Sequence, residues 1–335
     1  MNEDKQTVNI LRCFGFRQQD ASLVNCQGYR LFNGFYEGLP GLVIDRYANT
    51  LVIKNHSRQP ESLLKQIEQI ARSIHDNFPE IEALLLKTRH SKDAEERRGR
   101  FLSGQNLPTN FTENNISYSL DLRLNQDDSF YLDTRNLRAW LLQNSRDKRV
   151  LNFFAYTGSL GIAALAGQAA SVLQTDSNSA FLDQAERSRQ LNNFSGQMRL
   201  WSSDFFKAVA RLKQAKSLYD IVILDAPFFS QSRFGEVDLQ NETISLINKA
   251  RPLVAHEGRL VVINNSLFVP GSQVIDEIEQ MSRSGYVSLE QVIEIPADVT
   301  GYPETIRSAP PADPSPFNHP TKIAILRITR KDKAV

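Results

Sequence analysis

The stretch of sequence that decides the fold is RVLNFFAYTGSLGIAALAGQAASVLQTD, residues 149–176. Its pattern predicts a buried strand (Val150–Phe154), a glycine turn (Thr157–Gly158), a short helix (Ser159–Ala166) and a second strand (Ser171–Thr175) that ends in Asp176. A glycine between strand and helix lets a ligand approach backbone N–H groups, and a carboxylate at the next strand tip can accept hydrogen bonds from ribose hydroxyls. The stretch therefore predicts the first half of a nucleoside-binding β–α–β unit.

The turn itself indicates which kind of nucleoside is expected. It reads YTGSLG (Tyr156–Gly161) rather than G-x-G-x-x-G, so it lacks the glycines that cradle a pyrophosphate. A nucleoside without phosphates, such as S-adenosylmethionine (SAM), fits this turn better than a dinucleotide. The alternative is an ordinary β–α–β crossover, in which Gly158 only serves the turn and Asp176 is a solvated cap.

Length and charge set the first limits on function. The chain has 335 residues, enough for one large domain and a smaller one. Its 39 basic and 38 acidic residues give a net charge of +1, so the overall charge does not indicate a polyanion-binding protein. Any contact with nucleic acid must therefore come from a local basic face.

The cysteines and the N-terminus bear on metals and on location. Cys13 and Cys26 have no metal-ligand spacing, so neither a disulfide framework nor a metal site is expected. The start MNEDKQTVN is polar and unlike a signal peptide, and no window reaches the length of an apolar membrane span. We expect a soluble cytoplasmic protein with no membrane contact.

We divide the chain into an N-terminal arm or helix (1–27), a small α+β domain (28–125) and an α/β domain (126–335). The small domain is predicted from β-type runs between Gly28 and Asn55, an amphipathic helix at Glu61–Asn77, and later strands at 81–88 and 116–124. Its loop KTRHSKDAEERRGR (87–100) is rich in Lys and Arg. We expect this loop either to contact RNA phosphates or to form a solvated, salt-bridged surface.

From Ser129 onward strands alternate with helices, one of which is expected at Glu236–Ala255. This alternation predicts a Rossmann-like α/β sheet, mostly parallel, with helices on both faces and ligands at the carboxyl ends of its strands. Four strand ends carry suitable groups: Tyr156–Gly158 for the methionine end of SAM, Asp176 for the ribose, Ser203–Asp204 for the adenine amino group, and Asp225–Phe228 for a substrate base.

Two of these assignments have structural alternatives. Asp204 is also suited to cap the helix that follows it. Phe228 and Phe229 are also candidates for the core, because most large aromatic side chains are buried. Asp225 is harder to explain by structure alone, since a carboxylate at the end of the apolar run IVIL is costly without a partner.

Longer motifs resemble a known family. FYLDTRNLR (130–138), VLNFFAYTGSLGIAALAG (150–167) and LDAPFFSQSR (224–233) are similar to the class I SAM-dependent methyltransferases of 23S large-subunit ribosomal RNA, of the methyltransferase I and K type, and EGLPGLVIDRY (37–47) resembles that family's small central domain. The resemblance implies a Rossmann-like methyltransferase domain, with SAM as methyl donor and ribosomal RNA as substrate. It also implies that Tyr131, Asp133 and Arg135 help to close the SAM site, unless this segment is only a hinge with a salt bridge.

The chain departs from this family's pattern in three places. It begins too late to hold the family's N-terminal PUA RNA-binding domain. The usual D-P-P-x-F turn reads DAPFF (225–229), which suits the looser D-x-P-F form of enzymes that methylate base nitrogens. Where the family's cytosine-C5 enzymes have a cysteine after a late strand, this chain has Asn264, Asn265 and Ser266.

The missing cysteine bears on which atom is methylated. Cytosine C5 must be activated by addition of a thiolate to C6, whereas a base nitrogen needs only in-line positioning and a proton acceptor. Asn264 and Asn265 resemble the S-N-N of the guanine-N7 enzymes, and we expect them to bond a base edge or simply to turn the chain. A base nitrogen is therefore the expected target.

Taken together, these patterns predict an SAM-dependent RNA methyltransferase whose catalytic residues are Asp225, Phe228 and Asn264. The predicted cofactor-binding residues are Tyr131, Asp133, Arg135, Asn152, Phe154, Tyr156, Thr157, Gly158, Asp176, Ser177, Ser203, Asp204 and Asp225. The alternatives are a non-catalytic RNA-binding or ribosome-assembly factor with this fold, and a Rossmann oxidoreductase. A protein or small-molecule acceptor stays open, as does the choice between monomer and homodimer.

Overall fold

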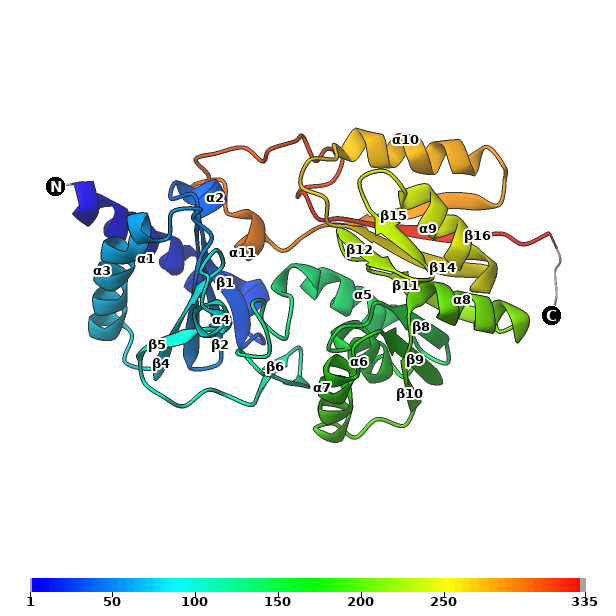
Figure 1. Cartoon of the computed structure of the whole chain (residues 1–335), viewed down its shortest axis with the longest axis horizontal. Coiled ribbons are helices and arrows are strands. Elements are labelled where there is room, and N and C mark those ends of the chain that lie inside the picture. Colours follow the sequence, from blue (N-terminus) through cyan, green and yellow to red (C-terminus); the bar gives the residue numbers. More distant parts are fainter. Residues whose placement is uncertain (1, 332–335) are drawn as a thin grey trace. The chain divides into compact units, whose positions relative to one another are not determined.

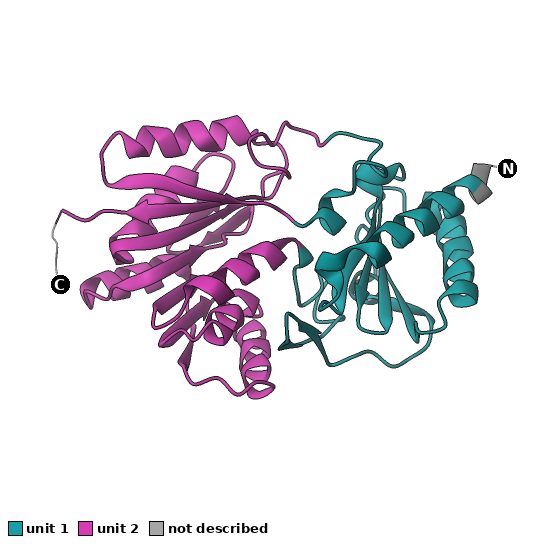
Figure 2. Cartoon of the chain, turned by 180° about the vertical axis from the view of Figure 1, so that it is seen from behind, with its two compact units in different colours: residues 1–132, 296–309 teal, residues 133–295, 310–335 magenta. Residues whose placement is uncertain are grey.

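The computed structural model describes residues 2–331. The chain forms two compact units (Figure 2): unit 1 comprises residues 1–132 and 296–309, and unit 2 comprises residues 133–295 and 310–335. Each unit has its own hydrophobic core. Of the helices between residues 2 and 331, none is long and apolar enough to cross a membrane.

Unit 1 is built on a five-stranded sheet in the order β1-β2-β3-β4-β5 (Figure 1). Strands β1, β2 and β3 run antiparallel, whereas β4 runs parallel to β3 because α3 connects them as a crossover. The helix α3 buries Leu63, Ile67, Ile70 and Ile74, which recur at helical spacing, and α1 adds Ile10 and other side chains to the same core.

The elements of unit 1 are α1 (Asn2–Gln19), η1 (Ala21–Leu23), β1 (Gly28–Asn33), α2 (Gly34–Glu37), β2 (Leu42–Tyr47), β3 (Thr50–Asn55), α3 (Glu61–Asn77), β4 (Ala83–Thr88), α4 (Ala94–Arg98), β5 (Arg100–Ser103), β6 (Asn110–Glu113), β7 (Ile116–Ser119) and α11 (Ala297–Thr300). The strand expected at 116–124 ends at Ser119 and pairs with β6 as a separate hairpin.

Unit 2 is built on a seven-stranded sheet in the order β10-β9-β8-β11-β14-β16-β15. The first five strands are parallel, and β16 pairs antiparallel with both β14 and β15. Helices α8, α9 and α10 share one core with the sheet, and α5, α6 and α7 pack together on the side of β8, β9 and β10 (Figure 1). The strand order reverses between β8 and β11, the position where open sheets of this kind bind ligands.

The elements of unit 2 are α5 (Arg135–Asn144), β8 (Arg149–Phe153), α6 (Ser159–Ala166), β9 (Ser171–Asp176), α7 (Ser179–Gln190), β10 (Gln197–Ser202), α8 (Phe205–Gln214), β11 (Tyr219–Leu224), β12 (Phe229–Ser232), β13 (Gly235–Asp238), α9 (Thr243–Ala250), η3 (Arg251–Leu253), β14 (Val254–Asn264), α10 (Gly271–Ser282), β15 (Val287–Ile293) and β16 (Lys322–Ile328). The short turn η2 (Leu132–Thr134) joins the two units.

The predicted Rossmann-like fold is confirmed, and residues 149–176 form a strand, helix and strand within one residue of the predicted limits. The helix expected at Glu236–Ala255 is present but shorter, since α9 covers only Thr243–Ala250. The first residues of the expected range belong to the β12–β13 hairpin, where Val237 is buried, and Asp238 ends the strand by accepting hydrogen bonds from the backbone of Gln240 and Asn241. Near its other end, Pro252 stops α9 in the short turn η3.

The division into units differs from the expected domain limits in two respects. The N-terminal helix α1 is part of unit 1 rather than a separate arm. Residues 296–309, expected in the α/β domain, belong to unit 1 because backbone groups fix them there: Asp298 accepts a hydrogen bond from the backbone N–H of Arg30, and Arg307 donates its own to Tyr36. Such long-range bonds leave no periodic signal in the sequence.

Candidate active site

The carboxyl edge of the parallel sheet in unit 2 gathers the predicted site residues. Phe153 at the end of β8 is in register with Thr175 of β9 and with Leu224 of β11, and Asp176 is in register with Ser202 of β10. The four loops that follow these strands therefore begin side by side. They carry the predicted segments around Tyr156, Asp176, Asp204 and Asp225.

Asp176 is suited to hold a ribose. One of its carboxylate oxygens accepts a hydrogen bond from the backbone N–H of Tyr156 at 2.9 Å, and the other accepts one from Asn178 at 2.9 Å. Burial raises the pKa of this carboxyl group, against the lowering effect of these backbone donors. The backbone of Ser177 also interacts with this carboxylate. An ionised carboxylate offers about four lone-pair sites, so capacity remains for a hydroxyl donor.

The glycines of the turn are required by the packing of the protein itself. Gly158 has a φ of +78°, and a Cβ there would lie 2.4 Å from the Cβ of Ala185 and 2.7 Å from the side-chain nitrogen of Gln174. A Cβ at Gly161 would lie 2.4 Å from Gln174 as well. Both glycines therefore make room for Gln174, a fully buried side chain that the sequence gave no reason to single out. This packing explains the glycines, while the approach of a ligand to the backbone of the turn stays a prediction.

Asn152 on β8 is tied to the same side chain. Its amide donates to the side-chain oxygen of Gln174 at 3.0 Å, while its own side-chain oxygen is buried and has no hydrogen-bond partner among residues 2–331. A buried acceptor without a partner is rare in proteins. This oxygen therefore suits a donor group of a bound cofactor.

The backbone of the turn between β8 and α6 is strained. Phe154 and Tyr156 have φ values of +53° and +50°, a region that is unfavourable for bulky side chains. Phe154 stacks on Phe205 at 4.9 Å, and the Tyr156 ring meets Phe181 edge-on at 4.6 Å. Strain of about 1–3 kcal/mol per residue is characteristic of functional loops, and here it aims the N–H of Tyr156 at Asp176. Thr157, the next residue, is buried.

Asp204 caps the helix α8. One carboxylate oxygen accepts hydrogen bonds from the backbone N–H groups of Phe206 at 2.9 Å and Lys207 at 3.2 Å, as the alternative interpretation expected. Ser203 bonds through its backbone to the tip of β9, and the carbonyl of Ser177 accepts a hydrogen bond from Ser202. These contacts rigidify the tips of β9 and β10, and the second oxygen of Asp204 stays available for an amino group.

Asp225 at the end of β11 is the most perturbed group of the site. Its carboxylate has no hydrogen-bond or ion-pair partner among the described residues. Burial, and then the negative charge of Asp133, raise its pKa to about 7. Asp133 itself accepts a hydrogen bond from the hydroxyl of Thr321 at 3.2 Å. A carboxylate that is half protonated near neutral pH is suited to proton transfer.

The aromatic residues after Asp225 are exposed. Phe228 and Phe229 are 45% and 55% accessible, so the alternative that they belong to the core is wrong. Leu267 and Phe268, which follow the adjacent strand β14, are also exposed. Exposed aromatic side chains beside a polar strand tip offer faces on which a nucleobase can stack.

Asn264 is fully committed to the protein. Its buried amide donates to the carbonyl of Leu239 at 3.2 Å and to the hydroxyl of Thr243 at 3.1 Å, and its oxygen accepts a hydrogen bond from the backbone of Ser266. Leu239 in turn donates its N–H to the carbonyl of Phe228. Of the two expectations for Asn264, these bonds favour the structural one: its amide is used within the protein and helps to hold the β12–β13 hairpin.

Lys322 is a feature that sequence reasoning missed. This buried side chain donates to the carbonyls of Ser266 at 2.8 Å and Pro320 at 2.5 Å, and no carboxylate in the described part of the chain pairs with it. Burial lowers its pKa to about 8. The pattern TKIAILRI predicts only a strand, so the burial of this lysine could not be read from it.

The segment FYLDTR does not act as one block. Tyr131 belongs to unit 1 and is 44% exposed, whereas Asp133 and Arg135 begin unit 2. Arg135 is buried at the start of α5, and Asp133 is the residue whose charge acts on Asp225. Asp133 is thus tied to the strand tip that carries Asp225.

Several cations of the basic loop of unit 1 (87–100) form ion pairs with acids inside and outside the loop. Lys87 is buried and pairs with Asp128 at 3.0 Å, and Arg89 pairs with Asp127 at 2.7 Å. Arg98, Arg100 and Arg123 each lie near Glu95 or Glu96. This geometry matches the salt-bridged alternative for most of these cations, whereas Arg97 donates only to the carbonyls of Ser91 and Lys92.

No thiol lies at the carboxyl edge of unit 2. Both cysteines of the chain belong to the core of unit 1, and burial raises the pKa of Cys13 to about 12, so this thiol stays protonated. Within residues 2–331, no cluster of three or more His, Cys, Asp or Glu side chains is arranged to hold a metal ion. The groups available for chemistry at the strand tips are therefore carboxylates, amides and aromatic rings.

Comparison with known proteins agrees with this geometry. The family described as S-adenosylmethionine-dependent methyltransferase matches residues 19–301. The ribosomal RNA large subunit methyltransferase I of Aeromonas salmonicida is 32% identical over 209 residues, which cover 62% of this chain and 52% of that protein. The enzyme of the same name from Photobacterium profundum is 29% identical over 295 residues, covering 83% of this chain and 72% of that protein. The chain thus spans about half to three quarters of these relatives' lengths.

Solved structures share the fold. SMU.776, a methyltransferase complexed with SAH, superimposes with a TM-score of 0.81 at 20% identity, covering 96% of this chain and 82% of the other. An SAM-dependent methyltransferase from Streptococcus mutans gives a TM-score of 0.78 at 19% identity, with 96% and 81% covered. At this level of identity the likeness concerns the fold alone.

Proposed function

The chain belongs to the S-adenosylmethionine-dependent methyltransferase family, and we propose that it transfers a methyl group from SAM to a base nitrogen of RNA, with large-subunit ribosomal RNA as the substrate. The relatives named as ribosomal RNA large subunit methyltransferases support the choice of RNA. The unpartnered, half-protonated carboxylate of Asp225 at the tip of β11 is the observation that carries the choice of nitrogen.

The residues at the strand tips fit the donor. Asp176 would accept the ribose hydroxyls, the free side-chain oxygen of Asn152 would accept a donor group, and the second oxygen of Asp204 would accept the adenine amino group. When bound, SAM supplies an electrophilic methyl group on a positively charged sulfur. Of the other cofactor-binding residues predicted from sequence, Phe154, Tyr156 and Gly158 support this site through packing and backbone geometry.

Asp225 would then serve the acceptor base. The lone pair of the base nitrogen forms the new N–C bond, while the bond from sulfur to the methyl carbon breaks and leaves its electron pair on sulfur. Where the nitrogen carries a proton, Asp225 accepts it or orients it by a hydrogen bond. A pKa of about 7 suits this role, because an acid–base group works best when its pKa is near the ambient pH.

Phe228 and Asn264 have different parts in this proposal. The exposed ring of Phe228 would stack on the target base, which must leave its own stack to reach the strand tips. Asn264 is a positioning residue that fixes Phe228 through Leu239. Methylation of cytosine C5 is disfavoured, since it requires a thiolate near the base and unit 2 contains no cysteine.

The test is labelling of ribosomal RNA from a strain that lacks the gene, with tritiated SAM, followed by nucleoside analysis. We expect a single N-methylated nucleoside with the wild-type protein. Calorimetry with SAM, SAH and NADH gives an independent readout of the cofactor. Binding of SAM without transfer to any RNA would favour a non-catalytic RNA-binding factor, binding of NADH alone would favour an oxidoreductase, and a C5-methylated pyrimidine would refute the choice of nitrogen.

A further inference from the structure

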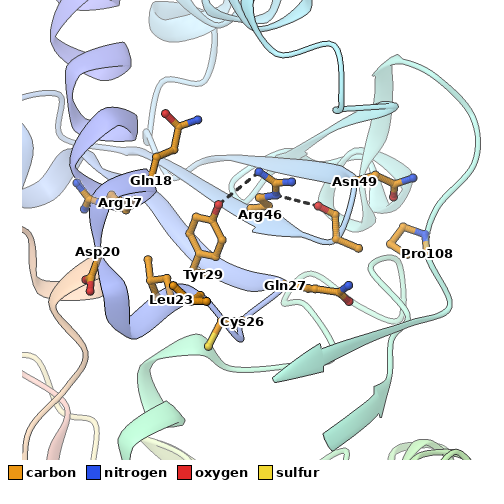
Figure 3. Close-up of a pocket in the computed structure, with 12 residues that line it drawn as sticks. Arg17, Gln18, Asp20, Leu23, Cys26, Gln27, Tyr29, Arg46, Asn49 and Pro108 are labelled. Carbon is orange, nitrogen blue, oxygen red and sulfur yellow. Dashed lines mark hydrogen bonds between the residues drawn. The ribbon is translucent and has the colours of Figure 1, made fainter. Parts of the chain in front are cut away.

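Unit 1 contains a cavity of about 690 Å³ that has no part in the site of unit 2 (Figure 3). The C-terminal end of α1, the turn before β1, and the turn between β2 and β3 surround it. Cavities that hold small ligands typically measure about 300–1,000 Å³. This cavity therefore has room for one nucleotide.

Arg46 provides an available positive charge in this cavity. Its guanidinium donates to the carbonyl of Ala48 at 2.9 Å and to the hydroxyl of Tyr29 at 3.3 Å, and it lies 5.8 Å from the centre of the Tyr29 ring. Both hydrogen-bond partners are neutral. The nearest carboxylate, that of Glu80, is 3.6 Å away and half exposed, so solvent weakens this pair. Arg46 is thus held in place with much of its charge uncompensated.

Three amide side chains surround Arg46 (Figure 3). Gln18 and Asn49 make no side-chain hydrogen bond to any other described residue, and Gln27 uses only its oxygen, which accepts a bond from the backbone of Thr112. An amide presents a donor and an acceptor side by side, as the edge of a nucleobase does. The lining therefore offers free hydrogen-bonding groups of the type that read unpaired bases.

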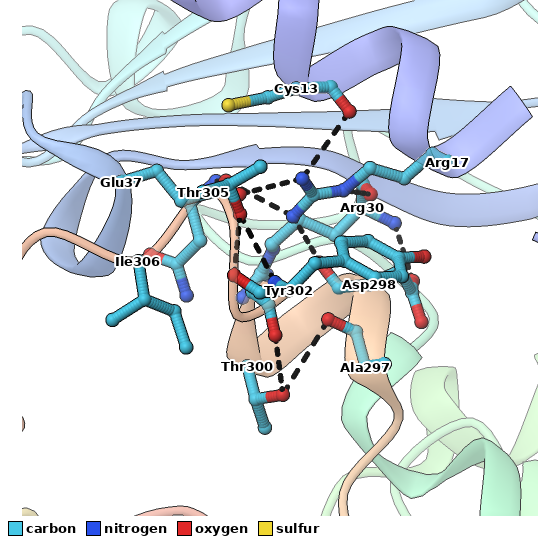
Figure 4. A network of polar contacts seen from close by, with 12 residues as sticks. Cys13, Arg17, Arg30, Glu37, Ala297, Asp298, Thr300, Tyr302, Thr305 and Ile306 are labelled. Carbon is cyan, nitrogen blue, oxygen red and sulfur yellow. Dashed lines mark hydrogen bonds and ion pairs between the residues drawn. The ribbon is translucent and has the colours of Figure 1, made fainter.

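The wall of the cavity is fixed before any ligand binds (Figure 4). Arg17 forms a fully buried ion pair with Glu37 at 2.6 Å and donates to the carbonyl of Asp298 at 2.8 Å. Asp20, the one acidic residue of the lining, accepts hydrogen bonds from the backbone of Ser22 and from the hydroxyl of Tyr302. Residues of the segment 296–309 thus order the lining, and a pre-ordered site loses less entropy on binding.

We propose that this cavity binds an unpaired nucleotide of the RNA substrate, with the amides of Gln18, Gln27 and Asn49 at the base edge and Arg46 at the adjacent phosphate. The inference rests on the proposed RNA substrate. It places an RNA contact of unit 1 in this cavity rather than in the salt-bridged loop at 87–100. No group of the cavity belongs to unit 2, so RNA binding there can be measured separately from methyl transfer.

The test places negative charge in the cavity without removing a hydrogen bond of the fold. The variant Gln18→Glu/Asn49→Asp changes two lining side chains that have no side-chain partner among the described residues. The control Gln19→Glu/Asn25→Asp adds the same charge on exposed side chains outside the lining. The full-length protein is titrated into a short fluorescein-labelled single-stranded RNA of mixed sequence, and the anisotropy is followed.

We expect the cavity variant to bind this RNA about five- to hundredfold more weakly, as for the loss of good base contacts, with unchanged thermal stability and unchanged SAM affinity. The RNA affinity of the control is expected to stay within about twofold of that of the wild type, because its added charges make no contact with the RNA and are screened by salt. An equal loss in both variants, or none in the cavity variant, would overturn the inference, as would a wild-type protein that does not bind the RNA.

Parallel labelling with tritiated SAM separates this inference from the proposed function. If the cavity variant binds and methylates RNA like wild type, the cavity inference fails while the proposed function stands. If wild type binds the RNA through the cavity but methylates none, the proposed function fails while the cavity inference stands.

Discussion

In unit 1, Asp45 and Asp128 are buried beside Lys54, whose amino group lies 2.6 Å from one carboxylate and 2.5 Å from the other. Arg30 pairs with Asp45, and Lys87 pairs with Asp128. Burial alone would raise the pKa of either carboxyl group, but these cations outweigh it and hold both pKa values below the ordinary range.

In unit 2, Lys322 is buried and Asp225 is only partly exposed, but neither has a partner of opposite charge among the described residues. Their pKa values move toward neutrality, to about 7 and about 8. Removing one partner of a buried ion pair strongly destabilises a fold, because the other charge is left buried alone. A buried charge without a partner destabilises the folded state, and such groups with shifted pKa values cluster at functional sites. The paired charges of unit 1 are thus expected to matter for stability and the unpaired charge of Asp225 for activity. Each prediction below tests either the paired or the unpaired charges.

Asp225→Asn is expected to have the largest effect on activity. It should lower kcat/KM for RNA methylation by about 10²–10⁴-fold, the range for loss of a general base. In wild type the rate should rise with pH through about 7 as the carboxyl group of Asp225 loses its proton, and the variant's rate should lack this step. Initial rates of label transfer across the pH range measure both quantities.

The same variant should be more stable than wild type above neutral pH. The pKa of Asp225 is raised in the folded state, so its ionisation opposes folding, and the cost grows as pH rises from the unfolded pKa toward about 7. Removing the charge should add about 1–2 kcal/mol to the free energy of unfolding at about pH 8. This value is smaller than the full pKa shift of Asp225 would give, because its side chain is partly exposed and solvent screens the charge. A variant that is inactive because it has unfolded would contradict this assignment.

Asp128→Asn tests the paired side of the comparison. The change leaves Lys54 and Lys87 buried without this carboxylate, so we expect the free energy of unfolding to fall by about 3–5 kcal/mol. Asp127→Asn is the matched control, because Asp127 pairs with Arg89 at the surface and should change stability by about 0.5 kcal/mol or less. The free energy of unfolding of both variants is measured with urea. Equal decreases in the two variants would mean that the buried ion pairs contribute no more to stability than the pair at the surface.

Lys322→Met should have the smallest effect. It removes two hydrogen bonds to carbonyls but also an unpaired buried charge, so the net change near neutral pH should stay within about 1 kcal/mol. The pKa of Lys322 is lowered in the folded state, so wild type should gain stability relative to the variant as pH rises from about 8 to about 10. Unfolding curves that keep a constant separation over this range would show that the pKa of Lys322 is not shifted.

The two units also show where sequence reasoning succeeds. The helix α3 has its predicted limits because its apolar residues recur at helical spacing over several turns. The β12–β13 hairpin is not predicted, and residues 236–238 are assigned to a helix, because each strand of the hairpin has only four residues, too few for a periodic signal. The sequence does not decide whether Phe228 and Phe229 lie in the core or at the surface, since an aromatic residue next to an apolar strand suits either position.

The sequence by itself determined that Asp176 and Asp225 lie at the ends of strands of one Rossmann-like sheet, because hydrophobic periodicity and chain order are local properties. Only the tertiary structure decided that Asn264 anchors a hairpin, that Gly158 accommodates Gln174, and that Lys322 is buried. Their partners lie far along the chain: Leu239 is 25 positions from Asn264, and Ser266 is 56 positions from Lys322. A hydrogen bond over such a separation depends on how the whole sheet brings its edges together, and no local pattern encodes it.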